Sequence, residues 1–395
     1  MDETQAHDDG ATPPPSADPS AAAAPEPPGS GPAVLGNSIS PQRGLLEWLA
    51  IVALGALLCL GLGHAEAALF FAGAGVFALA QASDAAVAFQ RYRHWVRDTL
   101  PERSGSGLLF RIVVRSLVPV TGALLYLGLG AYAWQLGEDP ARRLAAWWSF
   151  AAAAASLLLV SRTAADRLTT IFFRTGAPGR TRRLTARLVL LGLLLPVPLQ
   201  ALLPDLMQAL RDAPGPLASP GALVAQLAGE VAIALAGVGW LVRRTGRETL
   251  ERLGLVRPRP VSLLWVVLGL AGAIGLNSGM EALQHRWLPG LWQMDQEATR
   301  LIAGDMPVWT ALLLGLSAGF GEEVTLRGAL QPRLGIVLTA VFFAAGHVQY
   351  SWWGMLTIAL LGMLLGVVRR RTDTTTAIAV HMLYDVFAVV TSQGA

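Results

Sequence analysis

The sequence predicts an all-α, polytopic membrane protein, a bundle of transmembrane helices, on three observations. First, 53% of its 395 residues are hydrophobic and only 14% are charged, whereas soluble domains carry about 25% charged residues. Second, the mean hydropathy is +0.48. Third, several continuous apolar runs approach or exceed the roughly 18 to 20 residues needed to cross a bilayer. A β-barrel is disfavoured, because these runs do not alternate between apolar and polar residues.

Residues 1–40 are expected to be a disordered tail. They are rich in Pro, Ala, Ser and Gly and hold acidic residues but no Lys or Arg. Such a composition cannot bury a core. The tail is not expected to be a signal peptide, because it has neither a basic region nor an early apolar region.

Apolar segments then follow one another and predict about eleven helices, within a range of nine to twelve. Their approximate bounds are 44–63, 66–89, 113–134, 144–161, 188–208, 222–241, 261–280, 308–330, 336–350, 353–368 and 375–391. Arginine-rich connections alternate with connections that hold few arginines. By the positive-inside rule, this alternation predicts a cytoplasmic N-terminus. We expect the bacterial inner membrane as the location, membrane lipid as a partner, and no binding of nucleic acid.

An amphipathic stretch, R-E-T-L-E-R-L-G-L-V-R-P-R-P at 247–260, divides the membrane part in two. It is typical of a segment that lies along the membrane interface. Residues 41–245 are therefore expected to be N-terminal transmembrane helices without an assigned role. Residues 246–392 are expected to be a C-terminal core, which holds an unusual set of polar residues.

Ionisable residues inside transmembrane segments are costly and are functional candidates by default. The segment at 308–330 carries Glu322, Glu323 and Arg327. Glu323 and Arg327 are four residues apart with Glu first, the favourable order for a helical ion pair. Glu322 is rotated by about 100° from Glu323 on a helix, so the two carboxylates point in different directions. We therefore expect Glu323 to neutralise Arg327 and Glu322 to face a cavity.

Histidines follow in two later segments. His347 ends the stretch F-A-A-G-H, and His381 begins H-M-L-Y-D, which ends at Asp385. The spacing of four residues places Phe343 beside His347 and His381 beside Asp385 on their helices. Another pair with this spacing, Gln226 and Glu230, is interpreted as a polar contact that holds helices together.

These residues permit hydrolysis by two routes. A glutamate beside a histidine, as Glu322 and His347 could be, can take a proton from water and make it a nucleophile. His381 with Asp385 can then stabilise the oxyanion that develops on a carbonyl. Alternatively, Glu322, His347, His381 and Asp385 could bind a divalent metal such as zinc. The sequence lacks H-E-x-x-H, so a zincin-type site is not indicated.

The motifs E-E-V-T-L-R-G (322–328), F-A-A-G-H (343–347) and H-M-L-Y-D (381–385) resemble those of the CPBP family. This family comprises the CAAX-protease and bacteriocin-processing (ABI) intramembrane proteases, and its motifs are E-E-x-x-x-R, F-x-x-x-H and H-x-x-x-N/D. The resemblance implies a membrane-embedded endopeptidase, of glutamate type or metal-dependent, with the segment from 246 to 392 as its core. The implied catalytic residues are Glu322, His347, His381 and Asp385, and the implied orienting residues are Glu323, Arg327 and Phe343.

The implied substrate is a peptide or a lipid-anchored protein at the membrane. Two other functions stay open from the residues alone. Intramembrane carboxylates and histidines also build proton relays in transporters, although no repeated halves are evident here. A non-catalytic scaffold or immunity protein could keep the same fold, although the full set of polar residues argues against it.

Overall fold

The computed structural model describes residues 41–97, 106–173, 178–212, 218–304 and 306–392. The tail expected to be disordered, residues 1–40, lies outside them. The described residues form helices and no named strand, which confirms the all-α class. Eight of these helices are long and apolar enough to cross a membrane, or up to ten spans if each of two bent helix pairs is counted as one. This number overlaps the expected range but lies below eleven.

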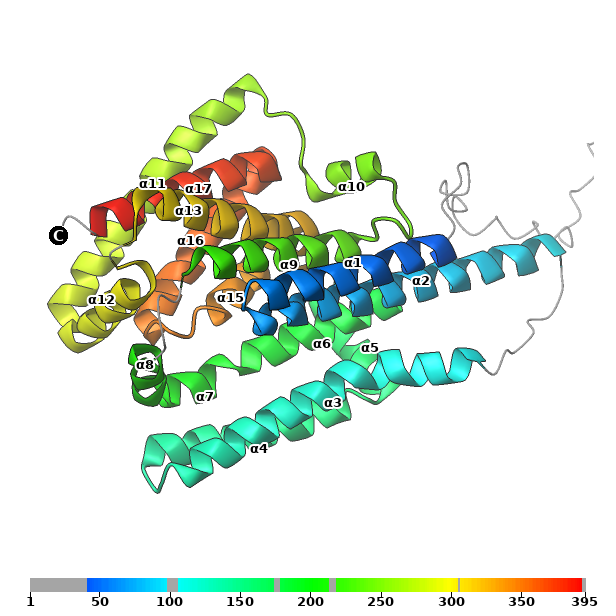
Figure 1. Ribbon diagram of the computed structural model, residues 1–395, viewed down its shortest axis with the longest axis horizontal. Coiled ribbons are helices and arrows are strands. Elements are labelled where there is room, and N and C mark those ends of the chain that lie inside the picture. Colours follow the sequence, from blue (N-terminus) through cyan, green and yellow to red (C-terminus); the bar gives the residue numbers. More distant parts are fainter. Residues whose placement is uncertain (1–40, 98–105, 174–177, 213–217, 305, 393–395) are drawn as a thin grey trace, which may run out of the picture.

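A layer of three helices begins the bundle (Figure 1). These helices are α1 (Pro41–Gly61), α2 (Ala68–Arg97) and α9 (Pro220–Val238), with a short 3-10 turn η1 (Ala65–Ala67) between the first two. Small and aromatic side chains fill the space between them, and the buried Trp48 donates its indole N–H to the carbonyl of Trp240 at 2.9 Å. This layer places α9 against the C-terminal core.

A hairpin and a bent chain of helices complete the N-terminal half (Figure 1). They are α3 (Ser106–Gln135), α4 (Pro140–Leu158), α5 (Arg162–Phe172), α6 (Arg180–Leu194), α7 (Pro196–Ala201) and α8 (Leu203–Arg211). Asp84 of α2 accepts hydrogen bonds from the backbone N–H groups of Arg180 and Thr181, at 2.9 and 3.0 Å. It thereby satisfies orphan donors at the start of α6.

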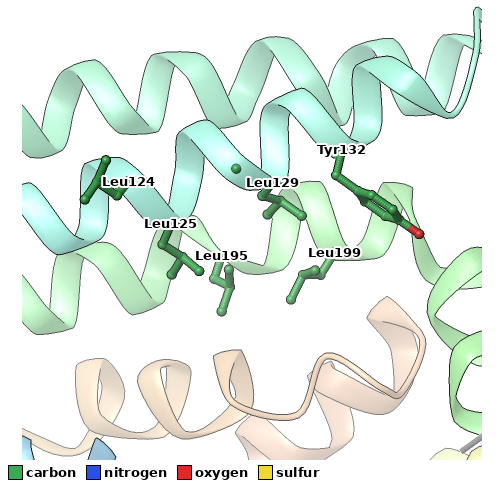
Figure 2. A pocket seen from close by; sticks show the side chains of 7 residues that line it. Leu124, Leu125, Leu129, Tyr132, Leu195 and Leu199 are labelled. Atoms are coloured by element: carbon green, nitrogen blue, oxygen red, sulfur yellow. The ribbon is translucent and has the colours of Figure 1, made fainter.

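An open, apolar cavity of about 520 Å³ lies between α3 and the α6–α7 bend (Figure 2). It is lined by Leu124, Leu125, Gly128, Leu129, Tyr132, Leu195 and Leu199. The candidate site residues do not line it.

The C-terminal half surrounds the candidate site. Its helices are α10 (Gly246–Leu253), α11 (Pro260–Trp287), α12 (Pro289–Ala303), α13 (Val308–Glu323), the π-helix η2 (Val324–Leu330), α14 (Gln331–Leu334), α15 (Ile336–Ala345), α16 (Trp352–Arg371) and α17 (Thr374–Ser392). The first of them, α10, begins with a capping box between Thr245 and Glu248. Hydrogen bonds from Thr245 lower the pKa of the Glu248 carboxyl, so this cap favours the ionised form.

Small residues let α13 and α17 approach closely. A Cβ added at Gly319 would lie 2.7 Å from the backbone nitrogen of Met382, and one at Gly315 would lie 3.0 Å from the Met382 carbonyl oxygen. Small residues at helix interfaces allow such backbone contacts in membranes. This packing sets the two glutamates at the end of α13 opposite the histidine of α17.

In the C-terminal half, two expected segments and the connection between 280 and 308 differ from the structure. The connection expected at 281–307 is helical, because α11 continues to Trp287 and α12 follows it. The segment at 308–330 changes from α-helix to π-helix at Val324. The segment at 336–350 contains only the ten-residue helix α15, and His347 lies after its end rather than well inside it.

Candidate active site

The two glutamates lie where α13 changes into a π-helix. Glu323 is the last residue of α13, and the π-helix η2 runs from Val324 to Leu330. A π-helix closes its hydrogen bonds over five residues instead of four, and single turns of it are frequent at functional sites. The sequence offers no proline at this point that would have predicted the change.

The ion pair between Glu323 and Arg327 is present and fully buried. Arg327 Nη1 lies 2.7 Å from Glu323 Oε1, and the two side chains are 1% and 0% exposed. Arg327 also donates to the carbonyl of Gly362 at 3.1 Å, and its guanidinium carbon lies 4.8 Å from the centre of the Phe343 ring. The Arg327 side chain therefore contacts residues of three helices, α13, α15 and α16.

The His381 imidazole lies among three carboxylates. Its Nδ1 is hydrogen-bonded to Oε1 of Glu323 at 2.9 Å. Its Nε2 faces Asp385 at 3.5 Å and Glu322 at 4.0 Å. An ionised carboxylate can only accept, so Nδ1 carries the hydrogen of the first bond. The expected pairing of His381 with Asp385 is present, whereas its bond to Glu323 was not foreseen.

Glu322 and Asp385 are less deeply buried than Glu323. Their side chains are 16% and 15% exposed, against 0% for Glu323. The predicted pairing of Glu323 with Arg327 is thus confirmed, and the cavity expected at Glu322 stays a prediction. Glu323 is enclosed by Arg327 and His381, and Glu322 keeps part of its carboxylate accessible.

The Phe343 ring lies between the imidazoles of His347 and His381 and contacts both. The ring centres of His347 and Phe343 are 4.7 Å apart, and those of Phe343 and His381 are 6.1 Å apart. His347 Nδ1 lies 3.0 Å from the Phe343 carbonyl oxygen. A carbonyl can only accept, so Nδ1 carries the hydrogen and Nε2 is left as the acceptor nitrogen of the neutral ring.

A further carboxylate, Glu230 of α9, lies beside the site. Its Oε2 would overlap a Cβ added at Gly321, the residue before Glu322. Gln226 donates to its Oε1 at 3.0 Å, and Thr325 donates to its backbone carbonyl at 3.0 Å. Oε2 itself is buried and has no hydrogen-bond partner among the described residues.

Sequence reasoning found the Gln226–Glu230 contact but not the position of Glu230 beside Glu322. The one sequence feature that pointed to Glu230 as a candidate site residue is that it is a carboxylate within an apolar segment. Nothing in the spacing shows that α9 packs against α13, because the two helices are about 90 residues apart in the chain.

A metal such as zinc would need ligands that converge on one point. Among the residues that the structure describes, no group of three or more His, Cys, Asp and Glu side chains is arranged to hold a metal ion. His381 uses Nδ1 for Glu323, and that same oxygen of Glu323 is paired with Arg327.

Comparison with known proteins places all three motifs within one matched region. Residues 304–387 match the family model described as Type II CAAX prenyl endopeptidase Rce1-like. Neither the curated proteins nor the solved structures give a significant match. The matched family is one of intramembrane endopeptidases that act on protein substrates in the membrane. The resemblance predicted from the motifs is therefore confirmed, and residues 304–387 form an Rce1-like domain of the CAAX-protease (CPBP) family.

Proposed function

We propose that the protein is an intramembrane endopeptidase that hydrolyses a peptide bond with a water molecule activated by Glu322 and His347. The observation that carries this proposal is the buried cluster around His381, with Glu322 as its accessible carboxylate. A carboxylate at this position can accept a proton from water. The family of the matched domain supports the same reaction class.

In this mechanism Glu322 takes a proton from the water, and the resulting hydroxide adds to the carbonyl carbon of the substrate. His347 Nε2 accepts a hydrogen bond from the same water and helps to orient it. Glu322 then gives its proton to the departing nitrogen as the carbon–nitrogen bond breaks. The products are a carboxylic acid and an amine, so the protons balance. General acid–base catalysis of this kind contributes typically 10²- to 10⁴-fold to the rate.

His381 and Asp385 stabilise the oxyanion of the tetrahedral intermediate. His381 Nε2 lies on the side of the imidazole that faces Glu322 and Asp385. A hydrogen on Nε2, or a protonated Asp385, can donate to the negative oxygen that forms on the substrate. Glu323 holds the imidazole in place through Nδ1, and Arg327 neutralises Glu323.

The substrate in this proposal is a membrane-associated or lipid-anchored protein. Its test uses the full chain in lipid vesicles and an internally quenched peptide that ends in a farnesylated C-a-a-X sequence, with the same peptide lacking the lipid as a comparison. The wild-type protein is expected to cleave the lipidated peptide, with the product identified by mass spectrometry, and His381→Ala is expected to lose that activity.

Equal cleavage by wild-type protein and His381→Ala would contradict the proposed mechanism. Proton flux across the vesicle membrane without cleavage would support a transporter instead. Absence of both would support the non-catalytic scaffold.

A further inference from the structure

His347 lies in a short connection between two helices, which side chains from other helices contact. The helix α15 ends at Ala345 and α16 begins at Trp352, so residues 346–351 carry the histidine outside any helix. Within the connection, the N–H of Tyr350 donates to the His347 carbonyl at 3.2 Å. The start of the connection is tied to α15, because the N–H groups of Gly346 and His347 donate to the carbonyls of Phe343 and Ala344 at 3.1 and 2.9 Å. Residues 348–351 receive further hydrogen bonds from side chains of other helices.

Asp295 of α12 holds the far end of this connection. Its Oδ1 accepts from the backbone N–H of Ser351 at 2.6 Å, and its Oδ2 accepts from the Ser351 hydroxyl at 2.7 Å. Gln284 of α11 also donates to Oδ2, at 2.5 Å. Asp295 is 8% exposed, so these bonds are shielded from water. Both oxygens of one buried carboxylate thus fix the residue that caps α16.

Gln200 of α7 holds the middle of the connection. Its Nε2 donates to the carbonyl of Tyr350 at 2.7 Å and to the carbonyl of Val348 at 3.3 Å. Val348 directly follows His347. The two donor hydrogens of one side-chain amide are therefore directed at the backbone on both sides of Gln349.

The position of α7 is itself fixed by the N-terminal half. Trp148 of α4 donates to the carbonyl of Leu194, just before α7, at 2.9 Å. Arg142 of α4 pairs with Asp205 of α8, just after α7, at 2.9 Å. The short helix is thus attached at both ends to α4, so Gln200 reaches the connection from a fixed support.

We propose that Gln200 and Asp295 are positioning residues for His347, and that the N-terminal half completes the active site through Gln200. This inference rests on the proposed function, because it assigns His347 a role in catalysis. Both residues lie outside the matched region 304–387. The proposal gives the helices at 41–245 a function that the motifs alone do not supply: they hold the water-orienting histidine at the correct place.

The expected effect follows from the geometry that catalysis requires. A displacement of about 1 Å at a catalytic group can cost on the order of 100-fold in rate. Gln200→Glu keeps the shape of the side chain but replaces both donor hydrogens with an acceptor that faces two carbonyl oxygens. We expect a fall in kcat of about 10- to 100-fold with KM changed by less than about twofold, since His347 does not bind the body of the substrate.

The matched control is Gln208→Glu, the same chemical change on the neighbouring helix α8. Gln208 is bonded to Arg211 and Asp212 at the protein surface, in contacts that lie away from the connection. Both variants are measured in the full chain in vesicles, with the quenched farnesylated peptide and with thermal unfolding. Amide hydrogen exchange, followed by mass spectrometry, reports the mobility of residues 346–351.

The proposal expects lower kcat and faster exchange at 346–351 in Gln200→Glu, with the control unchanged in both. A wild-type kcat, a change confined to KM, or unchanged exchange at 346–351 would overturn it. If Gln200→Glu does not fold, Gln200→Met removes the same hydrogen bonds without adding a charge and is judged by the same criteria. The proposed function fails separately, if His381→Ala cleaves the peptide as well as the wild type does.

Discussion

His381 and Glu323 are joined by a hydrogen bond of 2.9 Å, and the same carboxylate oxygen of Glu323 lies 2.7 Å from Arg327. The buried carboxylate of Glu323 therefore accepts a hydrogen bond from His381 and pairs with the guanidinium of Arg327, which lie on different helices. The second glutamate of the E-E pair is a support for the histidine as well as a counter-charge for the arginine. The first, Glu322, keeps a more exposed carboxylate and is the base in the proposed mechanism.

Glu323→Gln is expected to destabilise the protein strongly. The substitution removes the charge that neutralises Arg327, which is 1% exposed. Breaking a buried ion pair from one side costs about 3 to 5 kcal/mol, because the other charge stays buried. The control is Glu297→Gln, which breaks a half-exposed pair with Arg211 and should cost about 0 to 1 kcal/mol. Equal unfolding free energies for both variants would contradict the support role of Glu323.

Gly321→Ala is expected to lower activity by displacing Glu230. The added Cβ would overlap Oε2 of Glu230 and lie 3.3 Å from its Cβ. A second substitution, Glu230→Ala, removes the carboxylate that the new Cβ would meet. The double variant should therefore recover most of the lost activity. The interaction free energy between the two substitutions should be about 0.5 to 3 kcal/mol. Gly275→Ala in α11 is the control, since a Cβ there meets nothing within 4 Å. Additive effects of Gly321→Ala and Glu230→Ala would show that the two residues do not act on each other.

Asp385→Asn is expected to retain activity or raise it. The amide keeps the shape of the side chain and adds donor hydrogens beside His381 Nε2, where the carboxylate oxygen lies at 3.5 Å. A donor at this position can stabilise the oxyanion. Asp385→Leu, which offers no polar group, should lose on the order of 10²-fold in kcat. The reverse order of the two variants would argue that the carboxylate itself is needed.

Treatment with a chelator is expected to leave cleavage unchanged. The described His, Cys, Asp and Glu side chains form no metal-holding group of three or more, and His381 Nδ1 is used by Glu323. Cleavage is measured before and after incubation with 1,10-phenanthroline or EDTA, with a zinc protease as the positive control. Loss of activity that added zinc restores would contradict a mechanism that uses these side chains without a metal ion.

The sequence predicts the helical membrane class and the spacing-dependent contacts correctly. Glu323 with Arg327, and His381 with Asp385, are each four residues apart along continuous helical backbone, although the first pair spans the change from α13 to the π-helix η2. Helical geometry therefore brings both pairs together. Contacts inside one helix need no knowledge of the fold. For the same reason the Phe343–His347 contact was predicted, even though His347 lies beyond the end of its helix.

Contacts between helices could not be predicted in this way. The bond from His381 to Glu323 depends on the close packing of α13 and α17, and the approach of Glu230 depends on α9 lying against α13. The support of the His347 connection by Gln200 joins residues about 150 positions apart in the chain. Apolar patterning shows that a helix can span the membrane but does not show which helix packs against it. Contacts between helices can therefore be identified only once the three-dimensional structure is known.

The central claim is that Glu322 activates the water that attacks the peptide bond. The most direct test compares Glu322→Gln with Glu281→Gln for cleavage of the farnesylated peptide by the full chain. Glu281 is another carboxylate of a membrane helix, but its partners are Trp292 and Gln296 rather than His381. We expect kcat to fall by about 10²- to 10⁴-fold in Glu322→Gln only. A wild-type kcat in Glu322→Gln, with the protein folded, would contradict it.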